Sequence, residues 1–304
     1  MHAREAATKP RSAAAISNCC VAFAKKQEAG IGLKAVSSEH YTKGFYEKIR
    51  SGSRRSAEVI LPLVLEFLPV SSVVDVGCGD GSWLDVFRKL GVEEILGIDG
   101  EYMDRNLLQI PQDRFRPADL SRPFEVERVF DLAISLEVAE HLPPESASAF
   151  VASLCGLAPA VLFSAAIPFQ GGNHHLNEQW PDKWAELFGE HGYLAVDFVR
   201  KRVWQNEAVE WWYAQNTLLF VRRDLLESNA SLKAEFERTS SGQLHVVHPR
   251  QYLYLQGLYR EAAVRAENLR PPSGLKEASR LFLICLKNAV RKRIYSILGK
   301  ESRP

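Results

Sequence analysis

The sequence predicts a doubly wound α/β domain with a mostly parallel sheet, followed by a helical C-terminal extension. Strand-like runs alternate with helical segments between residues 56 and 167. These strand-like runs are almost wholly apolar, which is typical of parallel strands covered by helices on both faces. A glycine-rich turn follows the first of them, at the place where the carboxyl end of a parallel strand commonly meets a ligand.

The alternation begins with a helix at Ser56–Phe67, which ends near Pro69, and the first strand follows at Ser72–Val76. The elements expected next are helices Ser82–Leu90 and Glu145–Leu157 and strands Ile95–Asp99, Arg114–Pro117, Phe130–Leu136 and Ala160–Ile167. Each strand in this series is expected to lie parallel to its neighbours, because helical segments separate several of them.

After Pro181 the pattern changes. An amphipathic helix, Lys183–His191, precedes two aromatic and β-branched runs, Ala195–Trp204 and Asn216–Arg222, which we expect to pair antiparallel at one edge of the sheet. Long helices are expected beyond them, at Arg223–Arg238, Pro249–Asn268 and Leu275–Leu298. The last helix is basic and apolar, so two interpretations stay open: it packs on its own domain, or it lies on a membrane surface or a partner.

Composition narrows the classes of function. The 304 residues, 46% of them hydrophobic, are enough for a sizeable core, and 38 Lys and Arg residues nearly balance 37 Asp and Glu residues. This balance gives no strong signal for nucleic acid. The five cysteines lack zinc-ligand spacing and the density of a secreted scaffold, so we expect a reducing cytoplasm. No run reaches the roughly 18 to 20 apolar residues that span a bilayer, so we expect no transmembrane segment.

The turn after the first strand reads VVDVGCGDGSW, from Val73 to Trp83, with glycines at alternate positions. Glycines permit a tight turn and let backbone amides approach a ligand closely. A pattern of this kind alone does not distinguish between ligands.

The acids near this turn indicate which ligand it holds. Asp75 and Asp80 flank the turn, where the pyrophosphate of a dinucleotide would be repelled and a cation would be favoured. Asp99 ends the next strand, where a carboxylate can accept both hydroxyls of a ribose. The ligand is therefore expected to combine a ribose with a positive charge. An NAD-dependent oxidoreductase and a non-catalytic cofactor-binding protein remain as alternatives.

From Val73 to Arg222, roughly half of the chain, the sequence resembles the class I S-adenosylmethionine-dependent methyltransferases. This resemblance implies a seven-stranded Rossmann-like sheet, with VVDVGCGDG around the amino-acid part of the cofactor, Asp99 at the ribose, and Asp119 at the adenine with Leu120 beside it. The strand FDLAISLEVAEHL would end at the methyl donor. The cofactor contacts that the resemblance implies are Asp75, Gly77, Cys78, Gly79, Asp80, Asp99, Gly100, Asp119, Leu120 and Leu136.

The segment LEVAEHLPP offers Glu137, Glu140 and His141 at positions i, i+3 and i+4, which one helical turn would place on a single face. A later segment, GGNHHLNEQW, adds His174 and His175. This combination resembles the small-RNA terminal 2'-O-methyltransferases and, more loosely, the ubiquinone-pathway O-methyltransferases. The resemblance implies that Glu137, Glu140, His141 and His175 are catalytic and bind a divalent metal ion, with His175 taken over His174 by alignment alone.

The chemistry of this set leaves two interpretations. Mixed nitrogen and oxygen ligands suit Mn, Fe, Co or Zn better than Mg. In the metal-free alternative, His141 or His175 is the general base, and the glutamates cap or orient it.

We therefore expect a cytoplasmic methyltransferase that acts on a hydroxyl of a sugar, a glycan precursor or a small metabolite, with an RNA ribose as the alternative acceptor. We expect the chain to divide into residues 1–36, a disordered or dispensable extension or a transit segment; residues 37–223, the methyltransferase domain with an N-terminal helical lid; and residues 224–304, a helical extension. Peripheral contact of the basic C-terminal helix with a membrane stays an alternative. The oligomeric state is not indicated.

Overall fold

The computed structural model describes residues 43–268, 279–280, 282–283 and 286–287. The expected N-terminal extension, residues 1–36, lies outside these residues, as does most of the expected basic helix at 275–298.

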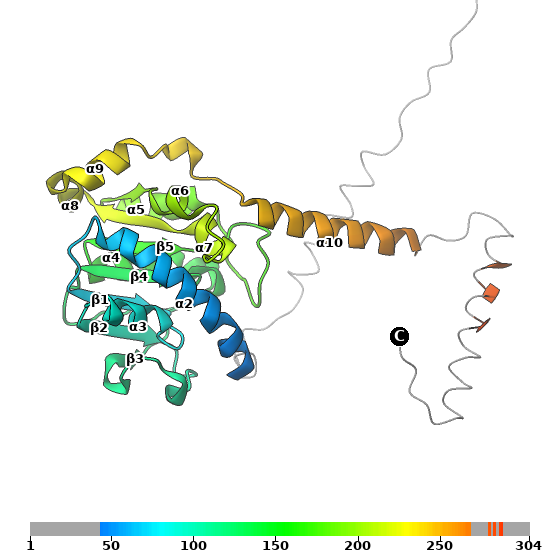
Figure 1. Cartoon of the computed structure of the whole chain (residues 1–304), viewed down its shortest axis with the longest axis horizontal. Coiled ribbons are helices and arrows are strands. Elements are labelled where there is room, and N and C mark those ends of the chain that lie inside the picture. The colour runs from blue at the N-terminus through cyan, green and yellow to red at the C-terminus, as the bar shows by residue number, and fades with distance from the viewer. Residues whose placement is uncertain (1–42, 269–278, 281, 284–285, 288–304) are drawn as a thin grey trace, which may run out of the picture.

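In the described part of the chain, seven strands form one sheet in the order β3-β2-β1-β4-β5-β7-β6 (Figure 1). The strands are β1 Ser72–Val76, β2 Glu94–Asp99, β3 Phe115–Pro117, β4 Leu132–Leu136, β5 Ala160–Ser164, β6 Tyr193–Val196 and β7 Leu218–Arg222. Strands β1 to β5 pair in parallel, whereas β7 is antiparallel to both β5 and β6. The predicted doubly wound, mostly parallel sheet is confirmed, including the antiparallel arrangement at one edge.

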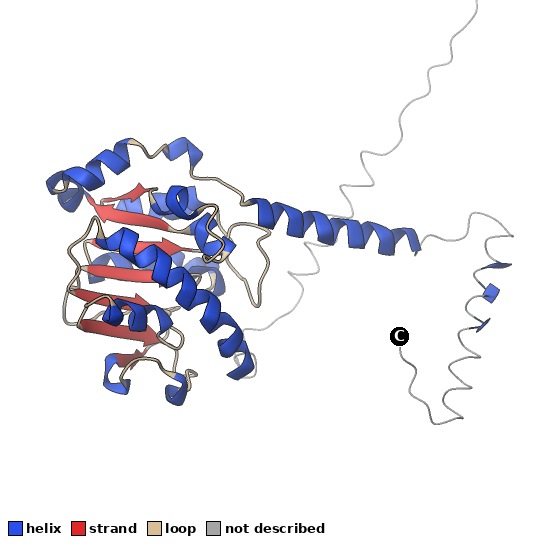
Figure 2. Ribbon diagram, in the orientation of Figure 1, coloured by secondary structure: helices blue, strands red, loops and turns tan. Residues whose placement is uncertain are grey.

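Helices cover both faces of this sheet (Figure 2). They are α2 Lys43–Leu65, α3 Ser82–Lys89, α4 Ala147–Leu157, α5 Pro181–Glu190, α6 Val199–Val203, α7 Trp211–Asn216, α8 Arg223–Ser228, α9 Ala230–Glu237 and α10 Pro249–Asn268. Successive strand residues face opposite sides, so Val73 packs in the cluster with α2 and α3, and Val74 packs in the cluster with α4 and α5. The apolar strands predicted from the sequence are therefore buried on both faces.

The expected strand Ala195–Trp204 is wrong in its second half. The strand ends at Val196, and α6 follows at Val199–Val203. Val199 and Val203 are both buried, at the spacing of one helical turn, and the buried Arg200 donates two hydrogen bonds to Asp197 at 2.9 and 2.7 Å. This tertiary ion pair and the helical spacing of the valines override their preference for strands.

The helical C-terminal part also differs from the expectation. The single helix expected at Arg223–Arg238 is two helices, α8 and α9, separated at Asn229. Helix α10 extends away from the rest of the structure (Figure 1). Among the described residues, none of the helices is both long enough and apolar enough to span a membrane.

Candidate functional site

The glycine turn joins β1 to α3 at the carboxyl end of the parallel strands. Gly77 has a φ of 83°, and a Cβ at this position would collide with the side chain of Val138. Its N–H donates to the carbonyl of Ile98 at 2.7 Å, so the turn is held against the end of β2. Only glycine meets both the backbone and the space requirement here.

Three buried carboxyl groups surround this turn, namely Asp75, Asp80 and Asp99. Burial, and after it the charges of Asp99 and Asp80, raise the pKa of Asp75 well above its usual range. Asp80 also caps the start of α3, since its Oδ1 accepts hydrogen bonds from Ser82 N and Oγ at 3.1 and 2.6 Å. Three acids gathered in a low-dielectric region favour a cationic ligand, as the sequence predicts.

Asp99 lies at the carboxyl end of β2, where the sequence places it. Its carboxylate accepts hydrogen bonds from Gly79 N and Gly100 N, both at 2.6 Å, and from the hydroxyl of Tyr102 at 2.7 Å. Burial raises the pKa of Asp99, and these three hydrogen bonds oppose that rise. Sequence reasoning missed Tyr102. Its only sequence signal is an aromatic residue three positions after the acid.

The remaining predicted cofactor residues lie in different surroundings. Leu120, Leu136 and Cys78 are buried, whereas the side chain of Asp119 is 58% exposed and binds Ser121 and Arg122. Burial and the neighbouring carboxylates raise the pKa of the Cys78 thiol well above its usual range, consistent with a packing role. Contact of these residues with a cofactor stays a prediction.

The expected helical turn through Glu137, Glu140 and His141 is not formed. Glu137 has a left-handed backbone with a φ of 57°, and only Ala139–His141 form a short 3-10 helix. Pro143 and Pro144 follow almost at once, and proline prevents the helix from continuing. The acceptor-site segment is therefore an irregular loop at the end of β4.

The structure nevertheless brings Glu140, His141 and His175 together, with one potential ligand atom of each within 4.8 Å of the others. Glu140 is fully buried, and neither of its carboxylate oxygens has a hydrogen-bond partner in the described part of the chain, nor has Nδ1 of His141. Burial, and after it the charge of Glu137, raise the pKa of Glu140 well above its usual range. Buried polar atoms without partners are costly, and they fit the ligand set of a divalent ion.

The two histidines of this cluster contact each other edge to face, with ring centroids 4.9 Å apart. Burial, and after it the neighbouring His175, lower the pKa of His141 to about 4. The imidazole of His141 is therefore neutral at pH 7, which is the form that can accept a proton or bind a metal.

The loop after β5 places His175 and not His174 in the cluster. Nδ1 of His175 lies 2.9 Å from Oε1 of Glu178, and the backbone N–H groups of Leu176 and Asn177 donate to the carbonyl of Glu140 at 2.7 and 3.0 Å. His174, with a φ of 57°, is exposed. A carboxylate behind a histidine commonly fixes its ring for metal binding, so Glu178 is a functional candidate in this loop.

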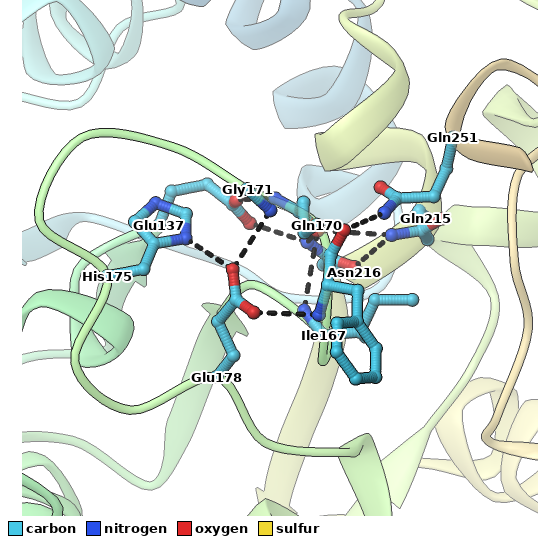
Figure 3. A network of polar contacts seen from close by, with 10 residues as sticks. Glu137, Ile167, Gln170, Gly171, His175, Glu178, Gln215, Asn216 and Gln251 are labelled. Atoms are coloured by element: carbon cyan, nitrogen blue, oxygen red, sulfur yellow. Dashed lines mark hydrogen bonds and ion pairs between the residues drawn. The ribbon is translucent and has the colours of Figure 1, made fainter. Parts of the chain in front are cut away.

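Glu137 lies close enough to Glu140 for its charge to act on that carboxyl group. Two side-chain amides hold the carboxylate of Glu137 (Figure 3). Gln170 Nε2 donates to Oε2 at 2.9 Å, and Asn216 Nδ2 donates to Oε1 at 3.0 Å. Sequence reasoning missed both amides, because neither belongs to a recognisable motif. Glu137 as a fourth ligand stays a prediction.

A family model described as a methyltransferase domain matches residues 46–222. The chain belongs to this methyltransferase family. It is an S-adenosylmethionine-dependent methyltransferase, which removes the NAD-dependent alternative. No curated protein sequence is significantly similar to it.

Solved structures of methyltransferases are similar to this methyltransferase at low identity. Magnesium protoporphyrin IX methyltransferase from Synechocystis PCC 6803, with bound SAH, is 22% identical over 66% of this chain and 94% of that one, with a TM-score of 0.43. The methyltransferase domain of bacterial CtHen1 is 20% identical over 55% and 97% of the two chains, with a TM-score of 0.40. A sugar N-methyltransferase from Streptoalloteichus is 14% identical over 64% and 98%, with a TM-score of 0.46.

Proposed function

We propose that this methyltransferase transfers the methyl group to a hydroxyl oxygen, assisted by a divalent ion that Glu140, His141 and His175 would hold. The observation that carries the proposal is the cluster of these three side chains beyond β4, in which both carboxylate oxygens of Glu140 and Nδ1 of His141 are buried and have no hydrogen-bond partner among the described residues. The methyl donor is a sulfonium and is already activated. The step that needs catalysis is therefore the removal of the proton from the acceptor hydroxyl.

The cluster supports this chemistry through its own side chains. When bound, a divalent ion lowers the pKa of a hydroxyl that it contacts. The neutral imidazole of His141 and the carboxyl of Glu140 supply mixed nitrogen and oxygen donors, a set that suits Mn, Fe, Co or Zn better than Mg. Glu137 would complete the set from its position beside Glu140.

The surroundings favour an acceptor with a ring. Phe169, on the loop that also bears His175, is 76% exposed. The N–H of Phe169 and the imidazole of His175 bind the same carboxylate, that of Glu178, so this aromatic residue lies close to the cluster. An exposed aromatic face beside a reactive site suits the apolar face of a sugar ring or of a flat ring system.

These features support a sugar, a glycan precursor or a small cyclic metabolite as the acceptor. An RNA ribose is the alternative, and the near balance of 38 basic and 37 acidic residues does not favour it, since RNA binding needs a positive surface.

The proposal is tested by calorimetric titration of metal-free protein with MnCl₂ and ZnCl₂. We expect His175→Ala to weaken ion binding by about 100-fold or more, because one of its few ligands is removed. His174→Asn is the matched control, since asparagine tolerates the left-handed backbone of this position, and it should bind the ion as the wild type does. Affinity for S-adenosylhomocysteine should be unchanged in both variants.

Methyl transfer to methyl α-D-glucopyranoside and to catechol, with and without a chelator, then tests the role of the ion. Loss of transfer on chelation supports the proposal. The proposal is contradicted if the wild type takes up neither ion and if the chelator does not change its methyl transfer. That result would favour His141 or His175 as a metal-free base.

A further inference from the structure

Helix α10 lies beyond residue 222, where the match to the methyltransferase family ends. The first turn of α10 nevertheless packs against the methyltransferase domain. Gln251 is 0% exposed, whereas Tyr252, Leu253 and Tyr254, which follow it, are exposed. His248, the residue before α10, is also buried, and its Nε2 lies 3.0 Å from the carbonyl of Trp204. The start of the helix is therefore fixed in place, and the rest projects outward (Figure 1).

One route leads from α10 to the loop that bears His175. Gln251 Nε2 donates to the carbonyl of Phe169 at 2.9 Å, and the N–H of Phe169 donates to Oε2 of Glu178 at 2.7 Å. Phe169 has a φ of 67°, which a phenylalanine rarely adopts unless its neighbours hold it there. The hydrogen bonds on both sides of Phe169 hold this conformation, and the same Glu178 carboxylate contacts His175.

A second route leads from the start of α10 to Glu137 (Figure 3). The backbone N–H of His248 can only donate, and it donates to Gln215 Oε1 at 2.8 Å. The amide nitrogen of Gln215 must then point the other way, where it lies 3.1 Å from Gln170 Oε1 and 3.0 Å from Asn216 Oδ1.

The hydrogen bonds keep the same donor-to-acceptor direction as far as the carboxylate of Glu137. Because Gln170 and Asn216 accept from Gln215 through their oxygens, their amide nitrogens are left to donate to the two oxygens of Glu137. The backbone N–H of His248, together with that of Ile167, which donates to Gln170 Oε1 at 3.4 Å, thus fixes the orientation of these buried amides and, through them, of the Glu137 carboxylate.

We infer that the segment His248–Gln251, which lies outside the methyltransferase domain of the family, is part of the acceptor site of this enzyme. Gln251 and Gln215 are positioning residues: Gln251 holds the loop of His175, and Gln215 transmits the position of His248 to Glu137. The expected effect of Gln251 and Gln215 on ion binding rests on the proposed function. The expected effect of Gln251 on the conformation of the loop of His175 does not.

The test uses the full chain with Mn²⁺ alone as the probe. Gln251→Leu and Gln215→Met keep the approximate size of the side chain and remove its hydrogen bonds. Gln256→Leu, five residues further along α10 and half-buried, is the matched control. We expect the first two variants to weaken Mn²⁺ binding by about tenfold or more, as loss of groups behind metal ligands does, and the control to bind as the wild type does. Affinity for S-adenosylhomocysteine should stay unchanged and shows that each variant is folded.

Hydrogen exchange of residues 168–178 is the second measurement, and it should be faster in Gln251→Leu than in the control. If the wild type binds no Mn²⁺, the ion affinity gives no readout and the exchange rate alone decides the role of Gln251. Equal exchange and equal ion affinity in Gln251→Leu and the wild type would overturn the inference. If Gln251→Leu loses S-adenosylhomocysteine binding, the variant Gln251→Glu replaces it. This variant keeps the shape of the side chain and removes the amide donor, and the same two measurements, hydrogen exchange and Mn²⁺ affinity, decide the role of Gln251.

Discussion

Asp99 is the residue at which the predicted cofactor site is tested most directly. It is buried at the end of β2, and its carboxylate is oriented by two backbone N–H groups and by Tyr102. If it binds the ribose hydroxyls, Asp99→Ala removes charge-assisted hydrogen bonds worth about 3 kcal/mol or more, and affinity for S-adenosylhomocysteine should fall by about 100-fold. Calorimetric titration measures this change.

Two further variants complete the experiment. Asp104→Ala removes an exposed carboxylate that binds only Asn106 among the described hydrogen bonds, and it should leave affinity unchanged. Asp99→Asn keeps the size of the side chain and separates a lost charge from a disturbed turn. Undiminished binding by Asp99→Ala would mean that the ribose lies elsewhere.

For single residues, the sequence predicts the side chains whose positions depend on local spacing. Asp75 and Asp99 follow from their positions at strand ends, and Glu140, His141 and His175 come together as the resemblance implies. The residues that hold Glu137 could not be predicted. Gln170 and Asn216 are 33 and 79 residues away from it, and a buried amide has no distinctive pattern in one sequence. Tertiary contact alone gives these side chains their role.

At the scale of elements, periodicity predicts the central parallel strands well, but it mistakes α6 for a strand and predicts the ends of helices poorly. The runs around β1, β4 and β5 are continuous and apolar, so they are recognised at once. The helix expected at Arg223–Arg238 shows the limit, because its break depends on a tertiary contact. Asn229 Nδ2 donates to the carbonyl of Phe67 at 2.8 Å, and its Oδ1 accepts from Leu232 N at 3.0 Å.

This break gives a prediction about stability. Asn229→Ala removes the N-cap of α9 and leaves the carbonyl of Phe67 without this donor, so the free energy of unfolding should fall by about 1–2 kcal/mol. Lys233→Ala, at an exposed position of the same helix, should change it by less than about 0.5 kcal/mol. Urea unfolding followed by circular dichroism measures both. Equal stability of the two variants would show that α8 and α9 need no cap.

At the scale of the whole molecule, the sequence predicts the fold class but not where the domain ends. A boundary at residue 223 follows from the change in composition and stays a prediction. The structure shows that the residues after it contribute to the core. Leu226 and Leu232 are buried with α2 and α3, and Leu244 is buried with α4 and α5. The carbonyl of Leu244 also accepts a hydrogen bond from the buried Arg200 at 2.8 Å.

The last prediction compares a chain that ends at Arg223 with one that ends at Asn268. The shorter chain loses three buried leucines, worth about 1.5–3 kcal/mol each, and it removes one hydrogen-bond partner from each of Arg200 and Gln215, namely Leu244 O and His248 N. Its total loss, about 5–9 kcal/mol, is comparable with the whole stability of a typical domain, so we expect it to be unfolded and unable to bind S-adenosylhomocysteine. The longer chain keeps every one of these contacts and should bind as the full chain does. Thermal unfolding and calorimetry decide between them, and a stable, cofactor-binding chain that ends at Arg223 would place the boundary where composition alone puts it.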